Sequence, residues 1–164
     1  MSAARLVATF FGAGLLRPAP GTWGSLAALP AAWALMQGGL WPFLAAAVVI
    51  APLGYWATVR VMAETGNDDP SEVVIDEVLG QWVALIPIAW GAAFAGVAVE
   101  RLWPGWIAAF VLFRLFDIWK PGPVGWLDRR HDALGVMGDD VVAGVLAALG
   151  VVALAALAHL WLIP

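Results

Sequence analysis

Long apolar stretches alternate with short polar segments along the chain. No charged residue lies between Arg17 and Arg60, and this stretch is too long for a single membrane-spanning helix. Gly38, Gly39 and Pro42 interrupt it near its middle, and glycine and proline commonly end helices. The pattern therefore predicts a helix of about 15 residues followed by one of about 20, which is long enough to span a bilayer.

Three further apolar segments follow. Residues 78–99 carry no charge, residues 103–119 are interrupted only near their end, and residues 141–163 are disturbed only by His159. We therefore expect an all-α protein, a polytopic membrane bundle of about five membrane helices. The N-terminal apolar run Leu6–Leu16 predicts an additional interfacial helix that lies at the membrane surface.

The composition fits a single membrane-embedded domain over residues 1–164. Hydrophobic residues make up 63% of the chain, charged residues only 12%, and the mean hydropathy is +0.88. These values are far from those of an average soluble protein. The net charge of −4 gives no basic surface for nucleic acid. The absence of cysteine excludes disulfides, thiolate metal sites and cysteine nucleophiles. The sequence leaves the oligomeric state open.

The order of the predicted spans places three distant polar segments on one membrane face. If the helices cross the bilayer in turn, segments 17–25, 64–77 and 114–140 all lie on the side where the first helix begins. The positive-inside rule makes this face cytoplasmic, because it holds most of the basic residues and only Arg101 falls on the other face. The basic residues on the shared face are Arg17, Arg60, Arg114, Lys120, Arg129 and Arg130.

Acidic residues are concentrated in the same segments. Eleven of the twelve carboxylates lie in the second and third of them, and carboxylates beside hydrocarbon are costly unless they are paired or metal-bound. Asp76-Glu77 and Asp139-Asp140 are each expected to open a helix, where one acid can serve as a cap. Because capping needs only one acid of each pair, we favour Mg²⁺ ligation, which relieves their mutual repulsion. Of the preceding loop acids, Asp69 is the best placed to reach inward.

Two other segments carry candidate phosphate ligands. Arg114, Asp117 and Lys120 are spaced by three residues, so they share one face of a helix and can hold a phosphate and a metal together. A ladder of interfacial ion pairs explains this spacing equally well. The segment Gly21–Ser25 precedes the first helix, where free amides make an anion site. Taken alone, this segment favours an ordinary turn with Ser25 as N-cap. The candidate anion ligands here are Gly21, Thr22, Gly24 and Ser25.

Four sequence blocks resemble the phosphatidylglycerophosphatase A family. They are PGTWGS at 20–25, DPSEVVIDEVLG at 69–80, FRLFDIWKPGPVGWLDR at 113–129 and GVMGDDVVAG at 135–144. The resemblance implies a bacterial, multi-pass enzyme of the inner membrane that depends on Mg²⁺. It also implies removal of the terminal phosphate of phosphatidylglycerophosphate, which yields phosphatidylglycerol, at the cytoplasmic face.

The resemblance also implies roles for individual residues. The matching blocks carry the acidic site residues of the family onto Asp69, Asp76, Glu77, Asp117, Asp139 and Asp140, and the basic ones onto Arg114 and Lys120. Our hypothesis is that Asp76, Glu77, Asp139 and Asp140 hold one or two Mg²⁺ ions, with Asp117 completing the shell. Arg114 and Lys120 then bind the phosphate, and a metal-activated water or a carboxylate attacks it. The chain departs from the expected glycine pair at residues 131–134.

Two other functions remain open. A second metal-dependent head-group enzyme, the CDP-alcohol phosphatidyltransferase, also uses helical aspartates, but its spaced aspartate run is missing here. A membrane cation transporter or channel would pass ions along carboxylates, and it predicts acids near the midplane together with an internal repeat. The chain shows no repeat, and its acids are expected at helix ends.

Overall fold

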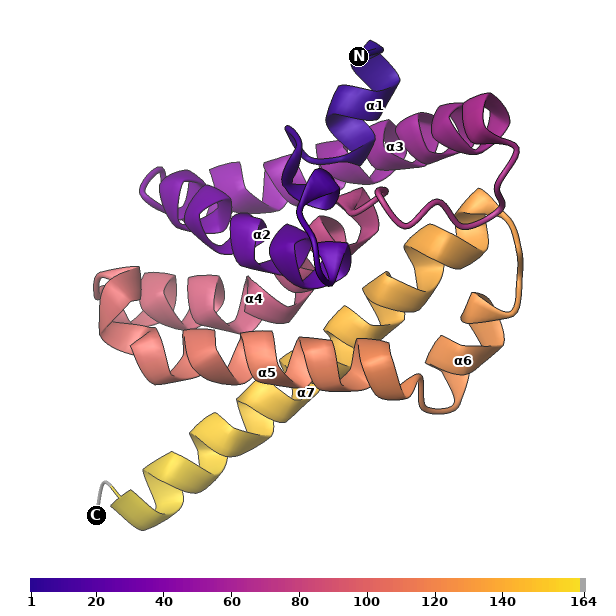
Figure 1. The fold of residues 1–164 in the computed structure, drawn as a ribbon. Coiled ribbons are helices and arrows are strands. Elements are labelled where there is room, and N and C mark those ends of the chain that lie inside the picture. The colour runs from indigo at the N-terminus through magenta and orange to yellow at the C-terminus, as the bar shows by residue number, and fades with distance from the viewer. Residues whose placement is uncertain (163–164) are drawn as a thin grey trace.

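The computed structural model describes residues 1–162, and the side chains of residues 1–160 (Figure 1). Over these residues it is all-α, as predicted, with no strand. Residue 163 of the last predicted span lies outside the described part. The elements are α1 (Ala3–Ala8), η1 (Ala13–Leu15), α2 (Pro20–Met36), α3 (Leu40–Thr65), α4 (Ile75–Ala95), η2 (Val99–Leu102), α5 (Trp103–Trp119), α6 (Pro123–Asp128) and α7 (Ala133–Leu162).

Four helical segments are long and apolar enough to cross a membrane. They are Leu40–Thr65, Ile75–Ala95, Val99–Trp119 and Ala133–Leu160. The remaining predicted membrane helix is the first along the chain, and it corresponds to α2. With 17 residues, α2 is shorter than these four segments. Large apolar side chains face outward along the bundle, such as Phe94 at 89% exposure, as expected where lipid is the solvent. The chain is therefore a multi-pass membrane protein.

Helix α4 is the centre of the bundle and packs against α2, α3, α5 and α7. Its crossing with α7 is close at Gly80, where an added Cβ would lie 2.5 Å from both the carbonyl oxygen of Asp140 and the ring of Phe113. On the opposite side, the Trp82 indole donates a hydrogen bond to Ala28 O at 3.0 Å and fixes α2 on α4. The absence of a side chain at Gly80 therefore brings the acidic pairs of α4 and α7 together.

The N-terminal segment is folded onto the bundle. The predicted interfacial helix at 6–16 is replaced by the short helix α1 and the turn η1. Three residues of positive φ lie between them, Phe10, Phe11 and Gly12. Arg5 pairs with Glu72 at 2.8 Å, and Ala8 O accepts the amide of Val74 at 2.8 Å. These contacts anchor the residues just before α4, so the segment stabilises the start of the helix that carries Asp76.

Two helix boundaries differ from the prediction. Helix α7 begins at Ala133, because the Asp132 carboxylate accepts the amide of Gly135 at 2.7 Å and caps the helix there. The Asp139-Asp140 pair therefore lies in the second turn of α7 and does not open the helix as expected. Helix α2 begins at Pro20, and proline is favoured at the first helical position. The PGTWGS block is therefore helical, and Ser25 is not an N-cap.

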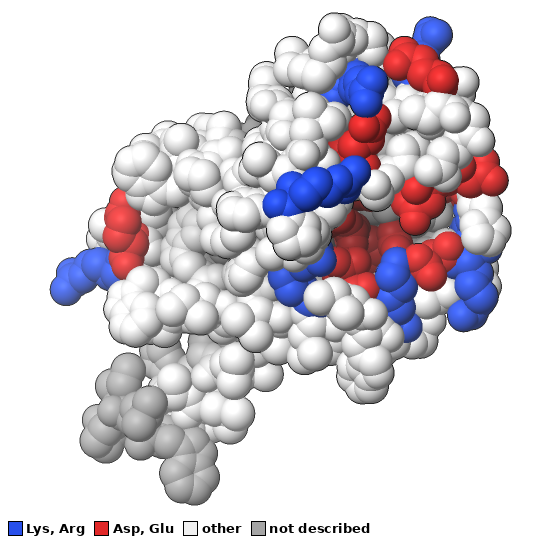
Figure 2. Space-filling view, viewed as in Figure 1, with Lys and Arg blue, Asp and Glu red and all other residues white. Residues whose placement is uncertain are grey.

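The predicted convergence of distant segments is confirmed. In Figure 1 the end of α3, the end of α5, α6 and the start of α7 lie at one end of the bundle. The charged side chains gather at this end, and only a small group lies at the opposite one (Figure 2). The topology thus builds a polar surface from the ends of apolar helices.

Candidate active site

A cavity of about 440 Å³ opens at the charged end of the bundle. Carboxylates lie at the bottom of this recess, and basic side chains lie at its rim (Figure 2). The cavity is lined by residues from five helices and the loops between them. The charged residues that line it are Asp69, Asp76, Glu77, Arg114, Asp117, Lys120, Asp128, Arg130, Asp139 and Asp140. Gly21 lines the cavity as well, whereas Thr22, Gly24 and Ser25 do not.

Three carboxylates meet at the inner wall of the cavity. Asp76, Glu77 and Asp140 offer oxygen atoms that all lie within 4.8 Å of one another. Asp76 is 7% exposed and Asp140 is 3% exposed, so water screens their repulsion poorly. Glu77 Oε2 is buried without a hydrogen-bond partner among the described residues. A buried group of like charges with an unused oxygen requires a cation or protons.

The donor set of this group fits Mg²⁺. The ion prefers carboxylate and water oxygens, and oxygens bound to one Mg²⁺ lie about 3–4 Å apart. The three carboxylates project from the first turn of α4 and the second turn of α7, and their oxygens lie within 4.8 Å of one another, which is close to this spacing. Asp117 and Asp139 line the same cavity and lie outside the three-carboxylate group. Asp69 lines the cavity from the exposed loop after α3.

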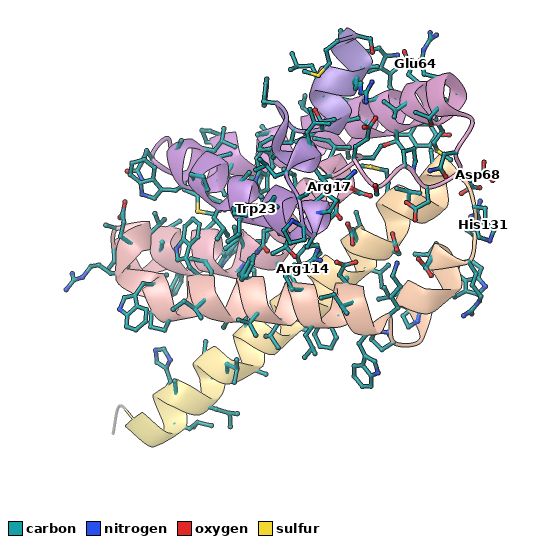
Figure 3. The ribbon with its side chains drawn as sticks, viewed as in Figure 1. Arg17, Trp23, Glu64, Asp68, Arg114 and His131 are labelled. Carbon is teal, nitrogen blue, oxygen red and sulfur yellow. The ribbon has the colours of Figure 1, made fainter. Side chains whose placement is uncertain are left out.

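Arg114 lies between α5 and the start of α2 (Figure 3). Its Nη1 atom pairs with Asp117 Oδ2 at 2.5 Å and donates to Ser25 Oγ at 3.3 Å. The Nε atom is buried and has no hydrogen-bond partner within the described structure. Asp117 and Ser25 thus fix the guanidinium of Arg114 at the wall of the cavity. The ion pair between Arg114 and Asp117 matches the predicted ladder of ion pairs on one face of α5.

The block at 20–25 serves the site differently from the prediction. Because it is helical, the amide of Thr22 donates to Ala19 O at 3.0 Å, and the block does not form a loop of free amides. Gly21 matters through close approach, since an added Cβ would overlap Glu77 Oε1 and lie 3.5 Å from Arg114 Nη1. Ser25 is fully buried, and its hydroxyl donates to Gly21 O at 2.9 Å. Gly24 packs against Val74, so its role is in packing.

Lys120 connects the inner and outer walls of the cavity. Its ammonium group pairs with Asp139 at 2.9 Å and also with Asp128. Partial burial lowers the pKa of Lys120, but the hydrogen bonds and charges of Asp128 and Asp139 outweigh this effect and hold the pKa above its ordinary value. The two carboxylates therefore favour the charged form of Lys120. Sequence reasoning missed Asp128, and the only available signal was its position in the block at 113–129.

The chain is similar in sequence to proteins of one known family. The family model for phosphatidylglycerophosphatase A matches residues 6–155. A protein of Escherichia coli named phosphatidylglycerophosphatase A is 38% identical over 146 residues, which cover 87% of this chain and 78% of the relative. A Haemophilus influenzae protein of the same name is 36% identical over 151 residues, covering 91% and 86%.

A third relative carries a different substrate in its name. The Bacteroides thetaiotaomicron protein named "Putative phosphatidylinositol-3-phosphatase" is 38% identical over 145 residues, covering 85% of this chain and 86% of the relative. No solved structure matches the chain. The family match and these identities show that the chain belongs to the phosphatidylglycerophosphatase A family, and that it is a phosphatase.

Proposed function

We propose that this member of the phosphatidylglycerophosphatase A family hydrolyses the terminal phosphomonoester of phosphatidylglycerophosphate. The reaction yields phosphatidylglycerol and inorganic phosphate, depends on Mg²⁺ and takes place at the cytoplasmic face of a bacterial inner membrane. The observation that carries the proposal is the group Asp76, Glu77 and Asp140, which shares one cavity with Arg114 and Lys120. Such a site needs an anionic ligand and a divalent cation together.

The three grouped carboxylates are the metal ligands in this proposal. Asp139 and Asp69 line the same cavity and are the further metal ligands in this proposal. A bound Mg²⁺ would neutralise phosphate charge and increase the acidity of a coordinated water. The buried, unpartnered Oε2 atom of Glu77 supports this assignment, because the fold otherwise leaves a desolvated acceptor unused.

Arg114 binds and orients the phosphate. Its guanidinium matches phosphate oxygens with donors in a planar fork, and Asp117 and Ser25 fix that fork in place. A fixed cation beside the phosphorus stabilises the charge that spreads over the equatorial oxygens in the transition state. Asp117 therefore acts through Arg114, in addition to any contact with the metal.

The chain offers two routes for the attack on phosphorus. In the first, a water held by the carboxylates attacks, the bond from phosphorus to the glycerol oxygen breaks, and this oxygen takes up a proton. In the second, a carboxylate such as Asp140 forms an acyl phosphate that water then hydrolyses. Acid quenching with labelled substrate distinguishes them, because only the second route leaves phosphate attached to the protein.

The placement of the site suits a lipid substrate. The cavity opens at the end of helices whose outer surfaces are apolar, so acyl chains can stay in the bilayer while the head group enters. Six basic residues belong to this end of the bundle by helix order, and basic residues favour the cytoplasm. They are Arg17, Arg60, Arg114, Lys120, Arg129 and Arg130.

A substrate panel tests the proposal. Purified protein in detergent is offered phosphatidylglycerophosphate, phosphatidate, lysophosphatidate and phosphatidylinositol 3-phosphate, with Mg²⁺ or with EDTA, and released phosphate is measured. We expect Mg²⁺-dependent release, fastest from phosphatidylglycerophosphate, and loss of release in Asp140→Asn. Fastest release from phosphatidylinositol 3-phosphate would favour the activity in the name of the Bacteroides relative. Full activity in EDTA would refute the metal assignment.

A further inference from the structure

The ammonium group of Lys120 is shared by two carboxylates that belong to different parts of the site. Asp139, at 2.9 Å, lies on the inner wall, and its side chain is 7% exposed. Asp128, the last residue of α6, lies at the outer wall, and its side chain is 42% exposed. Both carboxylates line the cavity together with Lys120. One cation therefore joins the inner carboxylates to a residue at the rim.

This sharing creates a competition at Asp139. While Lys120 donates to Asp139, that carboxylate is less available to a divalent cation, and the ammonium is less available to a phosphate. Release of Asp139 costs least if Lys120 keeps a second anionic partner that does not bind the metal. Asp128 fits this requirement, since its side chain is 42% exposed at the outer wall, whereas that of Asp139 is 7% exposed on the inner wall.

The backbone holds Lys120 and Asp128 in this relation. Lys120 is the C-cap of α5 with φ of 51°, a left-handed conformation that few residues other than glycine adopt. Helix α6 packs against this cap so closely that a Cβ on Gly125 would lie 2.6 Å from Lys120 O. α6 also packs along α7, which carries Asp139. The position of Asp128 relative to Lys120 is thus fixed by packing.

We propose that Asp128 is a positioning residue that holds the Lys120 ammonium over the cavity, so that Lys120 can release Asp139 when metal and phosphate bind. The inference rests on the proposed function, because it gives Lys120 a phosphate to bind. It assigns a role to an exposed aspartate outside the metal-binding group. It also predicts that the role operates through Lys120 alone.

Metal binding provides a test that does not depend on turnover. Mn²⁺ binding to the detergent-purified protein is followed by electron paramagnetic resonance, in the wild type, Asp128→Asn, Asp128→Glu and Asp68→Asn. We expect D128N to weaken Mn²⁺ binding by roughly fivefold to tenfold, because Lys120 then stays on Asp139. D128E should recover most of the affinity. D68N, which removes an equal charge from the exposed loop outside the cavity lining, should bind as the wild type does.

A double-mutant cycle separates positioning from a general loss of negative charge. In a Lys120→Met background, D128N should have no further effect on Mn²⁺ affinity, since the residue through which Asp128 acts is gone. Wild-type Mn²⁺ affinity in D128N, or an equal weakening in the K120M background, would overturn the proposal. If D128N does not fold, Asp128→Ser is judged by the same criteria.

Kinetics on phosphatidylglycerophosphate complete the test. D128N should raise KM by about tenfold while kcat changes by less than about threefold. The reason is that Lys120, which binds the phosphate, is misplaced, whereas the inner carboxylates are retained. An unchanged KM would count against the inference. If the wild type itself releases no phosphate from this lipid, the proposed function fails, and the Mn²⁺ measurements still decide the role of Asp128.

Discussion

Replacement of Gly21 by alanine tests the geometry of the site with the smallest possible change. The new Cβ would overlap Glu77 Oε1 and lie 3.5 Å from Arg114 Nη1. An ordinary contact between carbon and oxygen is about 3.3–3.6 Å, so the Glu77 carboxylate must move by on the order of 1 Å. The substitution adds one methyl group and changes no charge, so any effect must come from displacement.

The size of the effect follows from this displacement. Metal sites tolerate errors of about 0.2 Å in ligand distance, and a shift of about 1 Å in an active site can cost roughly a hundredfold in rate. We therefore expect kcat/KM of G21A to fall by about 10², which corresponds to about 2.7 kcal/mol of transition-state stabilisation. The fold should not suffer, because alanine is favoured over glycine within helices by up to about 1 kcal/mol.

The assay compares phosphate release with thermal unfolding in the same detergent. Gly91→Ala is the matched control, since this glycine is also helical and its added Cβ would meet only Leu102 Cδ1 at 3.8 Å. G91A should keep wild-type activity and unfold at an equal or higher temperature. If G21A were as active as G91A, Glu77 would not be held where the structure places it, and the metal assignment would lose its basis.

Three further outcomes can be checked. Asp140→Asn should lower activity at least about a hundredfold and abolish stabilisation by Mg²⁺, yet raise the unfolding temperature in EDTA, because one of three closely grouped acidic side chains is removed. Ser25→Ala should lower kcat/KM only about threefold to tenfold, since it removes one neutral acceptor from Arg114, and should leave stabilisation by Mg²⁺ unchanged. Because the chain has no cysteine, Asp68→Cys and Arg101→Cys can report topology. A membrane-impermeant maleimide should label position 101 in intact cells and position 68 only in inverted vesicles.

Much of the fold could be predicted, because the lengths of the apolar segments determine which helices can span a bilayer. The segment from about 103 to 119 was predicted close to the bounds of α5, since the apolar run begins near Trp103 and Pro121 and Pro123 stop the helix. The start of α7 was predicted too late, because only the apolar run was counted and the cap at Asp132 was not considered. A cap depends on one side-chain rotamer, which hydropathy does not encode.

The sequence indicated most of the charged residues that line the cavity, but not how these residues pair. Neighbouring residues on a helix point about 100° apart, so the two acids of a pair need not face the same partner. Asp140 joins Asp76 and Glu77, whereas its neighbour Asp139 pairs with Lys120. The pairing of Lys120 with Asp128 depends on how α6 packs, and no periodicity in the sequence reports that.

The distribution of polarity along the bundle bears on the choice between a phosphatase and a cation channel. The charged cavity occupies one end only. A second cavity of about 230 Å³ at the other end is lined by apolar residues and glycines, among them Met36, Ala92 and Val97. A transported ion would have to pass buried core residues such as Leu85 and Ile88, where no carboxylate can replace its water. The carboxylates are therefore arranged for chemistry at one membrane surface, where a lipid head group and its phosphate can reach them without leaving the leaflet.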